Sequence, residues 1–450
     1  MNSKNDPFPE LWFPFTCYQD TIDYPPVVMD HGRGIYLYDE KGKGYVDAIS
    51  SWWVNILGHN HPDISKAVKE QVDKLEHVLM AGFISRPAAE LSHKLSSLLP
   101  GGKTRIFYSD DGSTAVEAAL KIALQYWALK GERKTGFIAL SGAYHGDTLG
   151  AMSVGNIPQY HSLFHQRYKR ADFALSPYCY RCPLGKEKET CKAECMDSLE
   201  DILKEKADTT AACIFEPMVQ AAAGMRIYPV KVLKKIFALC KKYSVLTIAD
   251  EVAVGFGRTG KLFACEHVKE VPDIMCLAKG LTGGYLPLSA TVVKESVFDE
   301  FCGDAFSGKI FHHGHSFTGN PLAAAAACAA LTVIREEDIP RSLGKKIEHF
   351  SDQLMNFDTF EIVGDIRSLG MIGALELVKN RDTKEALDPE KRIPFRIAKK
   401  ALEFGLLIRP LGNVIYFMPA YCINEDEIDN MFYCAQRAIK TVLNENESSL

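Results

Sequence analysis

Short apolar runs alternate with helical stretches between about residues 105 and 335. Several runs are bounded by Gly, Asp or Pro, as expected for strands buried on both faces of a sheet. They predict strands at 105–109, 136–140, 211–216, 245–249, 274–277 and 288–293. The stretches at 114–129, 230–242 and 321–335 predict helices. This alternation is typical of an α/β fold, with a mostly parallel central sheet covered by helices on both faces.

The pattern changes after about residue 340 to short strands between single helices, which predicts a smaller α+β domain. Strands are expected at 361–367, 371–377, 406–409 and 414–417, and helices at 391–403 and 425–442. Strand and turn signals at 34–47 suggest that the N-terminal segment packs with this domain. We therefore predict an N-terminal segment (1–70), a large domain (71–335) and a C-terminal small domain (336–450).

Composition narrows the class of protein. The 450 residues exceed what one hydrophobic core usually serves. With 47% hydrophobic and 24% charged residues and a net charge of −5, neither disorder nor nucleic-acid binding is indicated. No apolar stretch approaches the roughly 20 residues of a membrane helix, and Met1–Glu10 does not resemble a secretion signal. We therefore expect a cytoplasmic protein whose 13 cysteines are reduced.

Two predicted strands deliver groups of opposite charge to one edge of the sheet. The run before Asp250 and Glu251 and the run before Lys279 both end where open α/β sheets bind ligands. A lysine amine can form a Schiff base with the aldehyde of pyridoxal 5′-phosphate (PLP), and an acid can keep its pyridine nitrogen protonated. Asp250 and Lys279 therefore predict a PLP site. A structural salt bridge is the alternative that spacing leaves open.

Two further segments suit the same cofactor. Gly112 and Ser113 open a predicted helix, where backbone amides and a hydroxyl can bind a phosphate, although an ordinary helix cap uses the same residue types. Tyr144 follows another strand and offers a ring that could stack on a cofactor or simply pack.

Taken together, these residues resemble the class III, or ornithine-type, aminotransferases, which are PLP enzymes of fold type I. The resemblance runs from Leu11 to about Val442. Its most specific motifs are Ser-Asp-Asp-Gly-Ser (109–113), Gly-Ala-Tyr-His-Gly (142–146), Ala-Asp-Glu-Val (249–252), Ala-Lys-Gly (278–280) and Ser-Phe-Thr-Gly-Asn-Pro (316–321).

The resemblance implies a role for each matching residue. Lys279 would be the Schiff-base lysine, Asp250 the partner of the pyridine nitrogen, and Tyr144 and Val252 the covers of the two ring faces. Gly112 and Ser113 would bind the phosphate. Ser316, with His315 beside it, would reach the phosphate of a neighbouring subunit. The family architecture thus implies a homodimer with active sites at the interface.

Within the class, the chain is most similar to the branch that converts 8-amino-7-oxononanoate to 7,8-diaminononanoate in biotin biosynthesis. The similarity rests on residues 11–16, 50–53 and 407–416, where Tyr416 replaces the arginine that many relatives use for an α-carboxylate. It implies that Arg409 binds the remote carboxylate of the keto acid. The other substrate contacts would come from Phe15, Trp52, Trp53, Tyr144, Asp147 and Gly314.

The amino donor stays open at this point. Trp52 favours S-adenosylmethionine, whereas Phe15 and the stretch around His315 also occur in relatives that resemble lysine-using versions. We favour S-adenosylmethionine. Another class III ω-aminotransferase and an aminomutase of the same fold are the alternative functions.

Cys179, Cys182, Cys191 and Cys195 form a C-x₂-C and a C-x₃-C pair eight residues apart. Four thiolates at this spacing could hold a structural zinc ion. PLP chemistry needs no metal, so we assign none and expect loose surface thiols.

Overall fold

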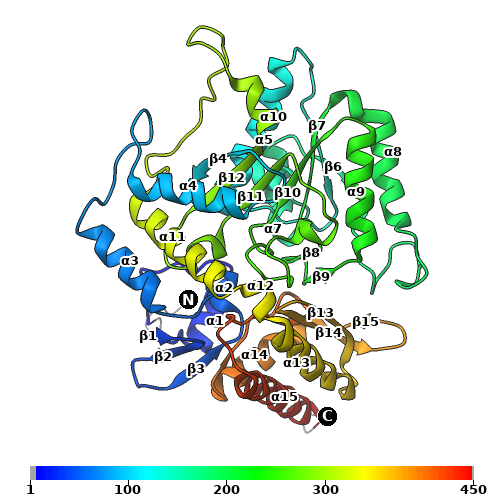
Figure 1. Ribbon diagram of the computed structural model, residues 1–450. Coiled ribbons are helices and arrows are strands. Elements are labelled where there is room, and N and C mark those ends of the chain that lie inside the picture. The colour runs from blue at the N-terminus through cyan, green and yellow to red at the C-terminus, as the bar shows by residue number, and fades with distance from the viewer. Residues whose placement is uncertain (1–6, 448–450) are drawn as a thin grey trace.

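A seven-stranded sheet forms the centre of the large domain in the computed structural model, which describes residues 7–447 and their side chains to residue 445 (Figure 1). Its order is β4 (Thr104–Ser109), β12 (Ser289–Lys294), β11 (Ile274–Leu277), β10 (Leu246–Asp250), β7 (Thr210–Phe215), β5 (Gly136–Leu140) and β6 (Asp172–Ala174). Neighbouring strands are parallel except that β12 runs antiparallel to β11 and β4. The predicted α/β fold is confirmed, and β6 is an additional strand.

Helices cover both faces of this sheet because its strands are apolar on both sides. In β7, Cys213 and Phe215 pack with α8 (Asp197–Lys206) and α9 (Val230–Lys242). The alternate residues, Ala212 and Ile214, pack with α5 (Gly112–Leu129) on the opposite face. Figure 1 shows α8 and α9 side by side along one flank of the sheet. Because helices cover both faces of the sheet, a ligand can reach it at the ends of the strands.

A second group of helices packs around α11 (Pro321–Glu336), whose alanines are mostly buried. Asn320 caps this helix by accepting hydrogen bonds from the backbone N–H groups of Leu322 and Ala323. Helices α3 (Pro62–Val72) and α4 (Arg86–Leu98) lie against it. The remaining helices of the large domain are short: α6 (Leu149–Ser153), α7 (Pro158–His161) and α10 (Glu295–Phe298).

The described residues of the predicted C-terminal domain form a sheet and several α-helices. The sheet contains β13 (Val363–Leu369), β14 (Ile372–Asn380), β15 (Glu385–Ala386) and β17 (Val414–Phe417). The helices are α12 (Ile339–Ser342), α13 (Gly344–Met355), α14 (Ile393–Glu403) and α15 (Glu425–Glu447). Before α9, the strands β8 (Val219–Gln220) and β9 (Arg226–Ile227) pair to form a short antiparallel ribbon.

The N-terminal segment forms a sheet with one strand from the C-terminal domain. After α1 (Tyr18–Asp23), its strands are β1 (Met29–Arg33), β2 (Tyr36–Asp39) and β3 (Gly44–Asp47). Strand β16 (Leu406–Leu407) pairs in parallel with β3, so that Leu407 lies opposite Asp47. The residues that follow these two strands are thereby brought close together.

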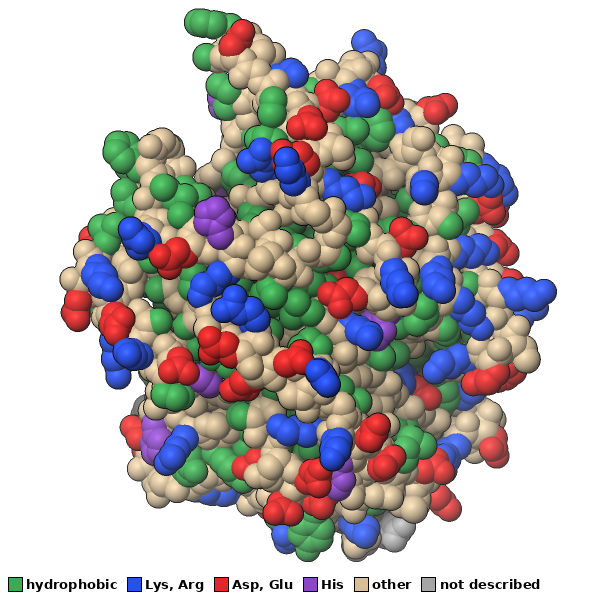
Figure 2. Space-filling model, in the orientation of Figure 1, with side chains coloured by type: hydrophobic (Ala, Val, Ile, Leu, Met, Phe, Trp, Pro, Cys, Tyr) green, Lys and Arg blue, Asp and Glu red, His purple; other side chains and the backbone are tan. Residues whose placement is uncertain are grey.

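Lys and Arg side chains are interspersed with Asp and Glu on the face of the molecule that Figure 2 shows. Within residues 7–447, no helix is long and apolar enough to cross a membrane. Residues 1–6, which belong to the segment Met1–Glu10 that does not resemble a secretion signal, lie outside the part of the chain that the structure describes.

Candidate active site

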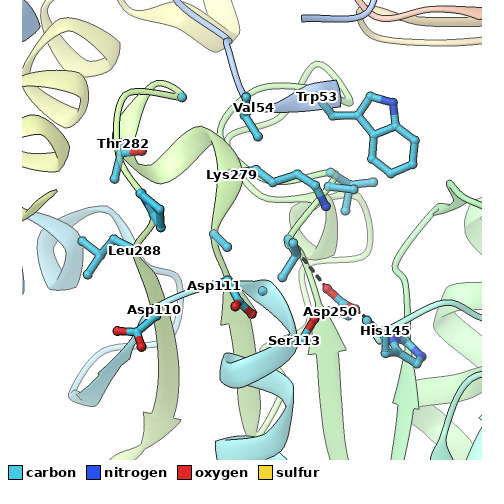
Figure 3. A pocket seen from close by; sticks show the side chains of 18 of the residues that line it. Trp53, Val54, Asp110, Asp111, Ser113, His145, Asp250, Lys279, Thr282 and Leu288 are labelled. Carbon is cyan, nitrogen blue, oxygen red and sulfur yellow. Dashed lines mark hydrogen bonds and ion pairs between the residues drawn. The ribbon is translucent and has the colours of Figure 1, made fainter. Parts of the chain in front are cut away.

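A cavity of about 400 Å³ opens at the carboxyl ends of β4, β7, β10 and β11 (Figure 3). This is the edge at which α/β sheets bind ligands. The cavity is lined by seven predicted site residues: Trp53, Gly112, Ser113, Tyr144, Asp250, Val252 and Lys279. The tertiary structure thus brings together residues from segments that are far apart in the sequence.

Lys279 follows β11 and has a left-handed backbone conformation, with φ of 45°. Its side chain points toward Asp250, beneath Trp53 (Figure 3), and Nζ lies 5.1 Å from the centre of the Trp53 ring. Burial lowers the pKa of Lys279, although the carboxylates of Asp250, Glu216 and Asp111 oppose this effect. A larger fraction of neutral amine is therefore present near neutral pH than for an ordinary lysine, as a nucleophile requires.

Asp250, the last residue of β10, is fixed from two sides. Its Oδ2 lies 2.6 Å from Nδ1 of His145, and its Oδ1 accepts a hydrogen bond of 3.0 Å from the backbone N–H of Val252. His145 is buried, and within the described chain its Nε2 has no hydrogen-bond partner. No role for His145 was predicted from the sequence, but its imidazole orients the acid that faces the cavity.

The N-terminus of α5 provides the candidate phosphate site. Asp111 caps the helix by accepting a hydrogen bond from the backbone N–H of Thr114. The cap therefore uses Asp111 and Thr114, while Gly112 and Ser113 line the cavity. A Cβ at position 112 would lie 2.7 Å from Cγ1 of Val252, so only glycine lets these segments approach this closely.

Tyr144 is held at both its backbone and its side chain. Its hydroxyl donates a hydrogen bond of 2.8 Å to Asp147, and its backbone N–H donates one to Glu216. Burial, followed by the contact with Asp147, raises the pKa of Tyr144, which therefore stays protonated. The predicted substrate residue Asp147 thus also fixes the orientation of Tyr144.

Glu216 and Glu251 are carboxyl groups that both follow buried strands but lie in different surroundings. Glu216 lines the cavity, and burial raises its pKa to about 7, partly opposed by His145. Glu251 lies outside the cavity lining and accepts hydrogen bonds from the backbone N–H groups of Ala264 and Cys265. Burial likewise raises the pKa of Glu251 to about 7. Of the adjacent Asp250 and Glu251, only Asp250 therefore faces the site.

These raised pKa values predict that stability falls as the pH rises. A folded-state pKa of about 7 for Glu216, against an ordinary value of 4.5, means that only the folded chain holds this proton between those values. The stabilisation of the folded chain by this proton is complete below pH 4.5 and is lost by about pH 7. Its size is on the order of 3 kcal/mol. Glu216→Gln should reduce the pH dependence of the melting temperature of the cofactor-free protein.

The slope with pH is the diagnostic quantity in this experiment. The glutamine amide would face the backbone N–H of Ala221, which now donates to Glu216, so the variant should be less stable than the wild type at pH 5, and the difference should shrink as the pH rises. Melting curves at several pH values between 5 and 8 would show both effects. An unchanged slope would mean that Glu216 titrates well below pH 7.

A second cluster, formed by Phe15, Trp52, Tyr160 and Arg409, lies beside the cavity but is not part of its lining. The Arg409 guanidinium lies 4.9 Å from the centre of the Trp52 ring and donates a hydrogen bond of 2.8 Å to the carbonyl of Phe15. Tyr160 packs edge-on against both Phe15 and Tyr144, which connects this cluster to the cavity. The sequence analysis missed Tyr160.

Trp52 and Trp53 lie in a turn with an unusual backbone. Ser50, Ser51, Trp52 and Trp53 all have positive φ, with values of 49°, 45°, 72° and 75°. Each left-handed residue other than glycine costs roughly 1–2 kcal/mol. Such a turn persists only where surrounding contacts impose it, and strained turns of this kind concentrate at functional sites.

The predicted cofactor and substrate residues near position 315 lie outside the cavity lining. Nδ1 of His315 lies 2.9 Å from Oδ2 of Asp110, and Ser316 is exposed. Gly314, also exposed, is likewise absent from the lining. Their roles at a neighbouring subunit therefore stay predictions.

The four clustered cysteines line one narrow cavity of about 20 Å³ and are half-buried. These thiols are free and only partly exposed, and Val232 of α9 lines the same cavity. Burial raises the pKa of Cys195 to about 11. Within the described residues, no group of three or more His, Cys, Asp or Glu side chains is arranged to hold a metal ion.

The main cavity fits PLP on three counts. Lys279 is the one lysine among the described residues that line it, and its Nζ makes no hydrogen bond within the described chain. The acid Asp250 shares the cavity with this amine, and Gly112 leaves open backbone at a helix N-terminus. The amine can react with the aldehyde of PLP, and the acid can pair with its pyridine nitrogen. The backbone at the helix N-terminus can bind its phosphate.

Comparison with known proteins decides the family. The model of the class-III aminotransferases matches residues 18–439. The chain belongs to the class III aminotransferases. It is therefore a PLP-dependent aminotransferase of fold type I.

Individual relatives are similar over nearly the whole chain. An adenosylmethionine-8-amino-7-oxononanoate aminotransferase from Geobacter sulfurreducens is 43% identical over 96% of both chains. The crystal structure of an enzyme of that name from Methanocaldococcus jannaschii has a TM-score of 0.91 at 38% identity and covers 96% of this chain and 97% of its own. An amine transaminase from an uncultivated Pseudomonas species in a PLP-bound form has a TM-score of 0.90 at 33% identity, covering 96% of this chain and 99% of its own.

Proposed function

We propose that this aminotransferase transfers an amino group from S-adenosylmethionine to 8-amino-7-oxononanoate, forming 7,8-diaminononanoate in biotin biosynthesis. The observation that carries the proposal is the placement of Arg409, which stacks on Trp52 beside, and not within, the cavity lined by Lys279. A carboxylate separated from a reacting ketone by a hydrocarbon chain suits this arrangement. The names of the Geobacter and Methanocaldococcus relatives support the same reaction.

Arg409 is suited to bind the carboxylate of the keto acid. Within the described chain its guanidinium makes one hydrogen bond, to Phe15, which leaves N–H groups for a two-point contact with a carboxylate. Trp52 and Phe15 supply apolar surface beside it. Tyr416, in place of the arginine that many relatives use for an α-carboxylate, is buried with its ring edge-on to Trp53. Recognition of an ordinary α-amino acid at that position is therefore disfavoured.

The residues around the cavity have distinct catalytic roles. PLP supplies an aldehyde that takes up an amino group and a ring that accepts electrons. Nζ of Lys279 would anchor the cofactor and would move the proton at the substrate carbon. Asp250 would hold the proton on the pyridine nitrogen, and Gly112 and Ser113 would bind the phosphate. Tyr144 and Val252 would cover the two faces of the ring.

The proposed assembly is a homodimer. Ser316 is exposed and lies outside the cavity lining of its own chain, which supports a role at the phosphate of a neighbouring subunit. Phe317 and Phe306 in the same region are 60% and 98% exposed, as expected of residues that a second copy would cover. A cytoplasmic location stays a prediction from the sequence.

The proposed function predicts the product of one assay. The PLP-loaded protein should form 7,8-diaminononanoate from 8-amino-7-oxononanoate with S-adenosylmethionine, and little of it with lysine in parallel. Chromatography of the products would measure the diamine. If the diamine forms only with lysine, the amino donor is lysine and not S-adenosylmethionine. If neither donor gives product but another amine and ketone react, the substrate assignment is wrong and only the reaction class stands.

In the same assay, Arg409→Leu should lower kcat/KM for the keto acid by about 10- to 100-fold, mainly through KM, because a charge-assisted contact is lost. Arg437→Leu is a matched control, since Arg437 stacks on Phe404 at 4.0 Å outside the cluster. Equal effects of the two substitutions would contradict the role of Arg409.

A further inference from the structure

The left-handed turn Ser50–Trp53 contains no glycine, so contacts from outside the turn must impose its conformation. It is separated from the end of β3 by Ala48 and Ile49 and carries both tryptophans of the site. Within the turn, the backbone N–H groups of Trp53 and Val54 donate to the carbonyls of Ile49 and Ser50. These local bonds close the turn but do not select its handedness, because the same carbonyls could accept in other conformations.

Asp47, at the end of β3, contacts Ser51 in the turn and Ile49, the residue that precedes it. Its Oδ2 accepts a hydrogen bond of 2.7 Å from the Ser51 hydroxyl, and its Oδ1 accepts one of 3.3 Å from the backbone N–H of Ile49. Burial raises the pKa of Asp47, but hydrogen bonds from His59 and Ser51 outweigh this and hold it below the ordinary value. Asp47 is therefore a buried, charged acceptor directed at the turn.

His59 holds the carboxylate of Asp47 in place. Its Nε2 lies 3.0 Å from Oδ2 of Asp47, and its Nδ1 lies 2.8 Å from the Asn55 amide nitrogen, just beyond the turn. Its backbone N–H and carbonyl pair with Gly34 of the N-terminal sheet. The backbone of His59 is thus anchored to Gly34, and its ring bridges Asp47 and Asn55, which flank the turn on either side.

The opposite side of the turn is equally confined. The Ser50 hydroxyl donates a hydrogen bond of 2.7 Å to the carbonyl of Met418. A Cβ at Gly284 would lie 3.0 Å from the backbone of Val54 and Asn55, so this loop packs directly on the end of the turn. The turn is therefore held on one side by Asp47 and His59, and on the other by the Ser50 hydroxyl and the loop at Gly284.

We propose that Asp47 and His59 are positioning residues for transamination, because they lock the Ser50–Trp53 turn that places Trp53 over Lys279 and Trp52 against Arg409. The two contacts are 5.1 Å and 4.9 Å from the respective ring centres. One strained turn thereby couples the amine of the cavity to the carboxylate clamp beside it. Loss of the lock alters both sites at once, although neither Asp47 nor His59 lines the cavity.

Asp47→Ala in the PLP-loaded enzyme tests this inference. The substitution should raise KM for 8-amino-7-oxononanoate about tenfold or more and change kcat less, because Arg409 and Trp52 lose their relative position. It should also move the pH midpoint of the visible cofactor band upward, because Trp53 then shields Lys279 less from water. The KM measurement rests on the proposed function, whereas the cofactor band needs no substrate.

Glycine at position 51 provides a rescue that depends on the turn. Because φ at Ser51 is 45°, Ser51→Gly removes the steric cost of the left-handed conformation. The double variant Asp47→Ala/Ser51→Gly should bring KM and the band midpoint back toward wild type, with KM within about threefold. Asp39→Ala is the matched control, since Asp39 accepts comparable hydrogen bonds from Lys41, Lys43 and Tyr45 in the same sheet. It should lower only the melting temperature.

Several outcomes would overturn the inference. The inference fails if Asp47→Ala lowers the melting temperature alone, if the glycine substitution does not restore KM and the band midpoint, or if Asp39→Ala shifts KM and the band equally. If Asp47→Ala does not fold, His59→Gln decides by the same criteria. If the wild type forms no diamine, the proposed function fails, and the band midpoint alone then decides the role of Asp47.

Discussion

Lys279→Ala should reduce transamination by about 10⁴-fold or more and abolish the visible absorbance band of the bound cofactor. The substitution removes both the nucleophile that anchors PLP and the base that moves the proton. No other lysine among the described residues lines the cavity, so no neighbouring amine can take over. Initial rates and absorbance spectra of the PLP-treated variant would measure both effects.

Lys134→Ala is a suitable control for this experiment. Lys134 is also a buried lysine over a tryptophan, with Nζ 4.0 Å from the centre of the Trp127 ring, but it lies outside the cavity. Its loss should lower the melting temperature and leave the rate within about threefold and the band intact. Borohydride reduction of the wild type should attach the cofactor to the peptide that contains Lys279. Label on a different peptide would contradict the assignment.

The sequence predicted the strands that position Asp250 and Lys279 because each is a short apolar run with a polar residue at its end. Such runs are a direct consequence of burial on both faces of a parallel sheet. Strands β5, β11 and β17 have the predicted bounds. The three-residue strand β6 was missed because three residues carry too little pattern to distinguish them from a loop.

Other parts of the site depend on contacts that no local pattern reveals. Glu216 was placed at the end of a predicted strand, but its link to the Tyr144 backbone spans 72 residues. The contact of His145 with Asp250 spans 105 residues. For these pairs the sequence provides the chemical groups, and the topology of the sheet determines which of them meet.

The turn at Ser50–Trp53 opposes local preference. Left-handed conformations are unfavourable for serine and tryptophan, so residue propensity predicts a different backbone here. The opposing contacts come from Asp47, His59 and Met418, and the last of these is 368 residues from Ser50 in the sequence. The resemblance to the family identified Trp52 and Trp53 as substrate residues but gave no reason for their orientation. That reason lies in tertiary hydrogen bonds.

Asp250→Asn should lower kcat by roughly 10³-fold while the protein still binds PLP through Lys279. An amide cannot keep the pyridine nitrogen protonated, so the ring would accept electrons less readily when the proton leaves the substrate carbon. The size of Asn is similar, and its oxygen can still accept the hydrogen bond from the backbone N–H of Val252. The loss should therefore appear in turnover, measured as the single-turnover rate of each half-reaction, more than in folding.

Glu251→Gln separates this electrostatic effect from a loss of buried charge near the site. Glu251 is the next residue and is fully buried, but its oxygens accept from the backbone N–H groups of Ala264 and Cys265, away from the cavity. We expect a lower melting temperature for Glu251→Gln, with turnover of the folded enzyme within about threefold. Two adjacent acids, one ending β10 and the other following it, would then differ by more than two orders of magnitude in their effect on rate. A wild-type rate for Asp250→Asn with one PLP bound per chain would show that another group holds the ring proton, and His145, 2.6 Å from Asp250, would be the next candidate.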